Sequence, residues 1–154
     1  MFMAMKNKKA FTLLELVMIA TIVGIMLYIA VPRLKFDTLG KYKADTIARK
    51  MVTDIRRTRS LAISDAAINS QGFELSNTSS PRGYRIVNLS TSAVVDSHTI
   101  DSDIGVSWGG YAGFAFGPLG NQLRATNSLT ISAEGRNFVI TVVQSTGTVK
   151  CVKN

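Results

Sequence analysis

The chain has 154 residues and a formal net charge of +8, from 18 Lys and Arg against 10 Asp and Glu. The excess positive charge lies near the N-terminus, since residues 60–154 carry six cationic and six acidic side chains. A neutral C-terminal part argues against a nucleic-acid-binding domain with a broad basic face. Cys151 is the only cysteine, which excludes a disulfide within these residues. We expect it to be half-buried near the end of a strand.

The first predicted element is an apolar helix over residues 11–32, FTLLELVMIATIVGIMLYIAVP, in which Glu15 is the single charged residue. At about 1.5 Å per residue, the segment spans roughly 33 Å. That length matches the hydrocarbon core of a bilayer, which is about 30 Å thick. Because Lys6, Lys8 and Lys9 precede the segment, the positive-inside rule places the N-terminus in the cytoplasm. The apolar stretch is longer than that of a cleaved secretory signal, so we expect a membrane anchor.

Three residues stand out within this segment, and the first of them does not suit a plain anchor. A carboxylate at the bilayer centre costs about 2.5–3.5 kcal/mol on insertion scales, so Glu15 is a candidate functional residue. Alternatively, Glu15 reaches the lipid headgroups and has no partner, because it lies near the start of the segment. Pro32 lacks an amide hydrogen and Gly24 is a poor helix former. Both predict a helix that bends or softens near its exit from the membrane.

The sequence KKAFTLLELVMIATIVGIMLYIAVP resembles the N-terminus of type IV pilins and type II secretion pseudopilins. The resemblance implies that residues 1–10 are a leader, which a prepilin peptidase removes by cutting between Ala10 and Phe11. The same enzyme would methylate the new amino group of Phe11. Ala10 stands where the family usually has Gly. The resemblance also implies that Glu15 pairs with the amino group of a neighbouring subunit, which suits the need of a buried carboxylate for a cation.

Residues 33–70 are predicted to continue the helix into a head, as one long kinked helix with residues 11–32. An apolar stripe recurs at steps of three or four residues and should pack on the head: Ala44, Ile47, Ala48, Met51, Ile55, Thr58 and Ala62. The opposite face is basic and is expected to be solvated or to meet a neighbouring subunit: Lys43, Arg49, Lys50, Arg56 and Arg57. The sequence NSQG at 69–72 is the predicted stop.

Residues 71–154 form the predicted β-rich head. The expected strands are 73–76, 84–89, 93–100, 104–108, 128–133, 138–144 and 148–152. A polar stretch, 77–81, and a stretch rich in Gly and aromatic residues, 108–122, are interpreted as loops. The predicted fold class is therefore α+β and pilin-like, with a long kinked N-terminal helix packed on a C-terminal antiparallel sheet.

The runs DIRRTRSLAISDA and NFVITVVQSTGTVKCV are similar to the helix and the final strands of GspH/FimT-type minor pseudopilins. This resemblance implies a structural subunit of a type II secretion pseudopilus or a type IV pilus, for protein secretion or pilus assembly. Its partners would be other pilin or pseudopilin subunits, the prepilin peptidase, the inner-membrane assembly platform and the lipid bilayer. The implied location is the bacterial inner membrane, crossed once, with the head in the periplasm and later in the filament.

Two alternatives stay open. FimT-like minor pilins include DNA-binding proteins for uptake, and here Arg136, Lys150 and Lys153 are the candidate contacts. Affinity driven by phosphates grows with the number of cations engaged, so three cations predict weak binding. The other alternative is a membrane-anchored periplasmic protein that does not assemble.

Catalytic chemistry is not expected. His98 is the only histidine, and the glycines form no phosphate-binding motif. Asp96, Asp101 and Asp103 offer oxygen atoms to a calcium ion but lack the spacing of an EF-hand. We therefore expect no enzyme activity, no cofactor and no metal.

Overall fold

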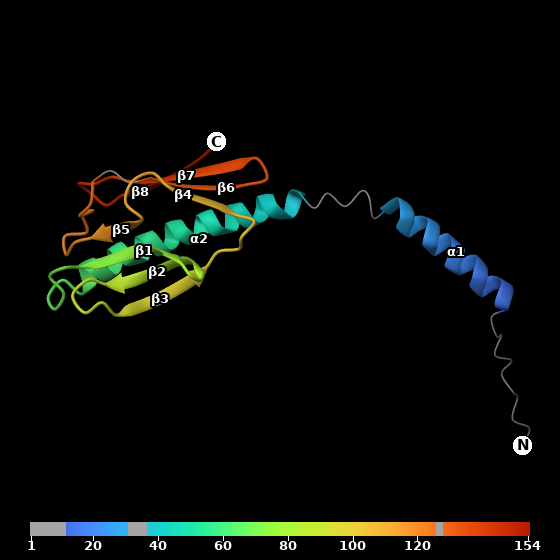
Figure 1. Ribbon diagram of the computed structural model, residues 1–154, viewed down its shortest axis with the longest axis horizontal. Helices are drawn as coiled ribbons and strands as arrows, with labels where there is room; N and C mark the ends of the chain where they lie inside the picture. The colour runs from blue at the N-terminus through green and yellow to red at the C-terminus, as the bar shows by residue number, and fades with distance from the viewer. Residues whose placement is uncertain (1–11, 31–36, 126–127) are drawn as a thin grey trace, which may run out of the picture. The chain divides into compact units, whose positions relative to one another are not determined.

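The computed structural model describes residues 12–30, 37–125 and 128–154 (Figure 1). The chain divides into two compact units, Met1–Phe36 and Asp37–Asn154, each with its own internal contacts. The fold class is α+β, as expected, with two helices and two antiparallel sheets among the described residues. We describe each unit by itself.

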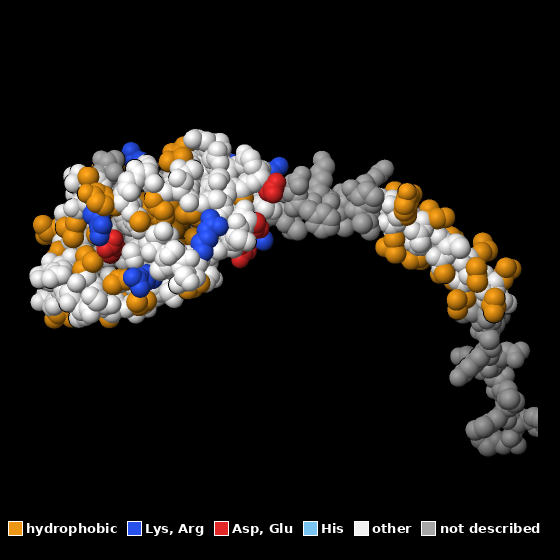
Figure 2. Space-filling model, in the orientation of Figure 1, with side chains coloured by type: hydrophobic (Ala, Val, Ile, Leu, Met, Phe, Trp, Pro, Cys, Tyr) orange, Lys and Arg blue, Asp and Glu red, His pale blue; other side chains and the backbone are white. Residues whose placement is uncertain are grey.

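The N-terminal unit contains α1, Leu13–Ala30, and none of the 18 residues of this helix is buried. Apolar side chains cover its visible length (Figure 2). The helix is long and apolar enough to cross a membrane. An α-helix that is apolar on all sides belongs either in a protein core or in a lipid bilayer.

The second unit begins with α2, Asp37–Ser64, which is shorter at its C-terminal end than the helix predicted up to residue 70. After Ser64 the hydrogen bonding changes to a shorter span, since the Ala66 amide donates to the Ile63 carbonyl oxygen at 3.4 Å. The predicted stop instead forms a turn, in which Asn69 Oδ1 accepts the Gly72 amide at 2.8 Å. Gly72 has a φ of 84°, which explains the glycine there.

Two four-stranded antiparallel sheets follow, in place of the single sheet that we expected. Their strand orders are β3-β2-β1-β5 and β4-β6-β7-β8. The strands are β1 Phe73–Ser79, β2 Arg82–Asn88, β3 Val94–Thr99, β4 Gly105–Trp108, β5 Gly113–Phe116, β6 Ser128–Ala133, β7 Arg136–Val142 and β8 Val149–Lys153. Apart from β1 and β5, the strands agree with the expected ranges to within two residues.

The loop predictions need two corrections. The first expected loop, 77–81, is mostly strand, because β1 runs on to Ser79 and pairs with β2 along its whole length. The second, 108–122, contains β5, whose four residues are all buried. β5 pairs with β1, and Phe114 lies opposite Leu75. A long-range partner therefore turns an aromatic-rich stretch into a core strand.

The helix α2 packs on both sheets and holds them together (Figure 1). Its predicted apolar stripe is confirmed, since Ala44, Met51 and Ile55 are each 0% exposed. The stripe joins side chains of both sheets in one hydrophobic cluster, which includes Phe114 and Ile140. The basic side of α2 is thereby fixed in position relative to the strands.

Candidate functional site

Most of the positions predicted for processing and bending lie outside the described residues. These are Ala10, Phe11 and Pro32, so cleavage, methylation and a kink at Pro32 stay predictions. Gly24 is described, and α1 passes through it as one continuous helix. A Cβ atom at Gly24 would meet nothing within 4 Å, so contacts within the chain do not require glycine there.

Glu15 lies in the first turn of α1. Its backbone amide donates a hydrogen bond to Thr12 Oγ1 at 3.3 Å. Thr followed three residues later by Glu is the pattern of a capping box, and a carboxylate in the first turn also interacts favourably with the helix dipole. This local role was not predicted from the sequence. Glu15 is thus suited to the start of a helix as well as to a partner outside the chain.

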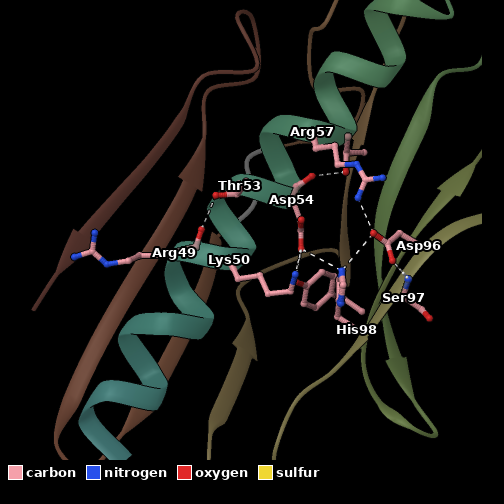
Figure 3. A network of polar contacts seen from close by, with 10 residues as sticks. Arg49, Lys50, Thr53, Asp54, Arg57, Asp96, Ser97 and His98 are labelled. Atoms are coloured by element: carbon pink, nitrogen blue, oxygen red, sulfur yellow. Dashed lines mark hydrogen bonds and ion pairs between the residues drawn. The ribbon is translucent and has the colours of Figure 1, made fainter.

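A group of polar contacts surrounds Asp54, a carboxylate on the buried side of α2 (Figure 3). Its side chain is 6% exposed, and its Oδ2 accepts a hydrogen bond from the Tyr84 hydroxyl at 2.5 Å. Lys50 Nζ and His98 Nε2 each lie 3.7 Å from the same oxygen. Burial, with the hydrogen bond to Asp54, raises the pKa of Tyr84, so its hydroxyl stays a donor. These partners offset the cost of burying a carboxylate.

A second carboxylate, Asp96 of β3, continues the network. Arg57 Nη1 lies 2.6 Å from Asp96 Oδ2, and His98 Nε2 lies 3.4 Å from it. Figure 3 shows Arg57 extending from α2 and His98 from the strand side toward Asp96. The hydrogen bond from Arg57 holds the pKa of Asp96 below its usual value. The network therefore clamps the β2–β3 hairpin to α2.

The carboxylates weighed as calcium ligands are engaged with cations. Asp96 pairs with Arg57, while Lys43 Nζ lies 3.3 Å from Asp101 and 2.9 Å from Asp103. Lys43 also lowers the pKa of Asp103. In the described parts of the chain, no group of three His, Cys, Asp or Glu side chains is placed to hold a metal ion.

These pairs correct the prediction for the basic side of α2. Lys43 and Arg57 contact carboxylates of the β-rich part and Lys50 contacts Asp54 of α2 itself, so these three do not face only solvent or another subunit. The other two, Arg49 and Arg56, line a groove of about 480 Å³ between α2 and β8. The groove is lined by Asp45, Ala48, Arg49, Val52, Thr53, Arg56, Phe138, Cys151 and Lys153. We name it the α2–β8 groove.

The structure separates the three cations that were predicted to contact DNA. Lys153 lies opposite Phe138 in the β7–β8 register, on the sheet face that looks toward α2, whereas Lys150 lies opposite Thr141 on the other face. Strand side chains alternate between faces, which accounts for the division. Arg136, two residues before Phe138, shares the face of Lys153. The trio is therefore not one patch.

Cys151 also lies in the α2–β8 groove, and it is exposed, not half-buried as expected. It occupies the inner face of β8, but β8 is the last strand of its sheet and α2 leaves that face partly open. Partial burial of the thiol raises its pKa, which disfavours the reactive thiolate form.

No family model, curated protein or solved structure matches this chain. The features of the described residues that bear on function are α1, the polar network around Asp54 and the α2–β8 groove.

Proposed function

We propose that this chain is a minor pilin or pseudopilin, a structural subunit of a type II secretion pseudopilus or a type IV pilus. The observation that carries the proposal is α1, an apolar helix with no buried side chain and one acidic residue, Glu15, in its first turn. Such a helix needs lipid or other apolar helices around it. The similarity of the segment KKAFTLLELV to pilin N-termini supports packing of α1 against other apolar helices.

In this proposal α1 first anchors the chain in the inner membrane, with the head in the periplasm. A prepilin peptidase then removes residues 1–10 and methylates Phe11. The subunit leaves the bilayer when its apolar helix packs against those of neighbouring subunits. The chain would act through packing and would have no catalytic role.

The amino group released at Phe11 is the natural partner of Glu15. A carboxylate buried without a cation is strongly unfavourable, whereas a matched pair offsets much of that cost. Phe11 and Glu15 are four residues apart, which is about 6 Å along a helix. A small axial offset between neighbouring subunits would therefore bring the amine of one to the carboxylate of the other.

The alternatives have less support. DNA binding by Arg136, Lys150 and Lys153 is less well supported, because these side chains lie on two faces of the sheet and cannot contact one duplex together. A membrane-anchored protein that does not assemble would also use α1, and only processing and assembly distinguish it from a pilin.

The deciding experiment is an intact-mass measurement on protein extracted from membranes that contain a prepilin peptidase. A mass equal to residues 11–154 plus one methyl group is the expected result. The Ala10→Gly variant serves as the matched control, because it carries the residue usual in the family. An uncut chain in both proteins would rule out the pilin route and leave the simple anchor.

A further inference from the structure

The strand β8 has one side without a neighbouring strand. It is the last strand of the sheet β4-β6-β7-β8 and pairs only with β7 among the described strands. Four of its five residues are exposed. Five residues of strand extend about 17 Å, enough to pair with a short extended segment.

The hydrogen bonds to β7 identify which backbone groups of β8 are free. The Val143 amide donates to the Thr148 carbonyl oxygen at 2.9 Å, and the Asn154 amide donates to the Asn137 carbonyl oxygen at 2.9 Å. In an antiparallel ladder, residues bonded to the partner alternate with residues whose backbone groups point away. The outward-pointing residues of β8 are therefore Val149, Cys151 and Lys153.

The α2–β8 groove runs beside this free edge. A second hollow, of about 290 Å³, meets it at Arg56 and is lined also by Arg59, Gly147, Thr148 and Val149. Together the two hollows follow β8 from Val149 to Lys153. An extended segment added to β8 would thus have α2 along one side for its whole length.

The charges of the α2–β8 groove favour an acidic occupant. Three cations, Arg49, Arg56 and Lys153, line it with one carboxylate, Asp45. Asp45 is already paired with Arg49 at 2.8 Å, while Arg56 and Lys153 have no ion pair within the described parts of the chain. The two cations without an ion pair, Arg56 and Lys153, are therefore the groups that acidic side chains at alternate positions of an added strand, about 6.8 Å apart, would contact.

The same charges disfavour a second copy of β8 as the occupant. Lysines on an edge strand are a common means of preventing unwanted pairing between sheets. Two copies of β8 would bring Lys150 and Lys153 of each close together. An acidic strand would turn that repulsion into attraction.

We propose that the free edge of β8 accepts an extended segment of a partner protein, with acidic side chains at alternate positions that contact Arg56 and Lys153. The backbone of this segment would bond to Val149, Cys151 and Lys153, in the manner of β-strand addition. Nucleic acid fits less well, because it has no backbone that complements a strand edge and because Lys150 faces away from the α2–β8 groove. This inference does not depend on the proposed filament function.

The test uses the full chain in detergent micelles and a fluorescent seven-residue peptide with three glutamates at alternate positions. Binding is measured by fluorescence anisotropy. We expect Arg56→Ala and Lys153→Ala each to weaken binding about fivefold, since a partly exposed ion pair contributes up to about 1 kcal/mol. Lys150→Ala is the matched control, a lysine of the same strand on the other face, and should change binding less than twofold.

A second peptide separates strand addition from simple charge attraction. It keeps the three glutamates but has every backbone amide methylated, so it cannot donate the backbone hydrogen bonds of a ladder in either strand direction. We expect at least tenfold weaker binding of this peptide. Equal binding of both peptides, an equal loss from Lys150→Ala, or binding of duplex DNA without binding of the acidic peptide would each overturn the proposal.

Discussion

The two helices of this chain differ in what their side chains meet. No residue of α1 is buried, and its surface is apolar with one carboxylate. In α2, the apolar stripe is buried, and three cations, Lys43, Lys50 and Arg57, contact carboxylates of the same head. The apolar stripe and these three cations of α2 thus have their partners within the same unit. The apolar side chains of α1 have no such partners among the described residues and need lipid or other apolar helices around them.

The largest expected effect is on assembly. Glu15→Val should still allow α1 to insert in the membrane, because it makes the segment more apolar. It should reduce incorporation into filaments at least tenfold, because the proposed pair with the Phe11 amine is lost. A tenfold reduction corresponds to a loss of about 1.4 kcal/mol in the free energy of association. The measurement is the amount of the variant in sheared filaments relative to membranes. Glu15→Asp keeps the charge and serves as control. Normal recovery of Glu15→Val would contradict the role given to this residue.

The second prediction concerns the polar network of α2. Asp54→Ala should destabilise the head by about 2–4 kcal/mol, because it leaves the buried Tyr84 hydroxyl without an acceptor and Lys50 without its carboxylate. The measurement is denaturant unfolding followed by fluorescence of Trp108, the only tryptophan, which lies in β4.

Tyr84→Phe provides the matched comparison for Asp54→Ala. It removes the donor but keeps the ring and the other partners of Asp54, and it should cost about 1 kcal/mol. A loss as large as that of Asp54→Ala would mean that the tyrosine hydroxyl, and not the carboxylate, is the main stabilising element.

The third prediction compares glycines of the two regions. Gly72→Ala should destabilise the head by about 1–3 kcal/mol, because its φ of 84° disfavours other residues and its Cβ would overlap the Phe116 carbonyl. Gly24→Ala should leave the head unchanged, since a Cβ there meets nothing. Both are measured by the same denaturant unfolding. A destabilising Gly24→Ala would show that α1 contributes to the stability of the head.

The smallest effect is on pH dependence. Because Arg57 lowers the pKa of Asp96 in the folded state, this pair stabilises the head above about pH 3.9, the unfolded value. The contribution is lost as the pH falls through the folded pKa. Arg57→Ala should cost about 0.2–1 kcal/mol at pH 7 and reduce the loss of stability on acidification. Denaturant midpoints between pH 7 and pH 3 provide the test, and an unchanged slope in the variant would contradict the assignment.

Much of the fold follows from local patterns. The stripe of α2 and most strand positions are visible because the side chains repeat at helical or strand spacing. The division into two sheets is not visible, because it depends on which distant strands pair. β5 is the clearest case, since its four residues form a strand only through β1.

One member of the polar network, Asp54, could have been predicted from its position in the sequence. Asp54 stands three residues after Met51 and four before Thr58, which places it on the apolar stripe and predicts a buried, partnered carboxylate. Its partners Tyr84 and His98 could not be named, because β2 and β3 reach α2 only in the folded head. The α2–β8 groove was equally hidden, since it requires β8 to be an edge strand.

The position of α2 between the two sheets has a mechanical consequence. Tension applied from the N-terminal side enters the head at the first residue of α2, Asp37. Because α2 packs on both sheets along one buried stripe, the load is shared between them. Extraction of α2 would have to break both sets of contacts together, and this makes the second unit resistant to being pulled apart from its N-terminal end.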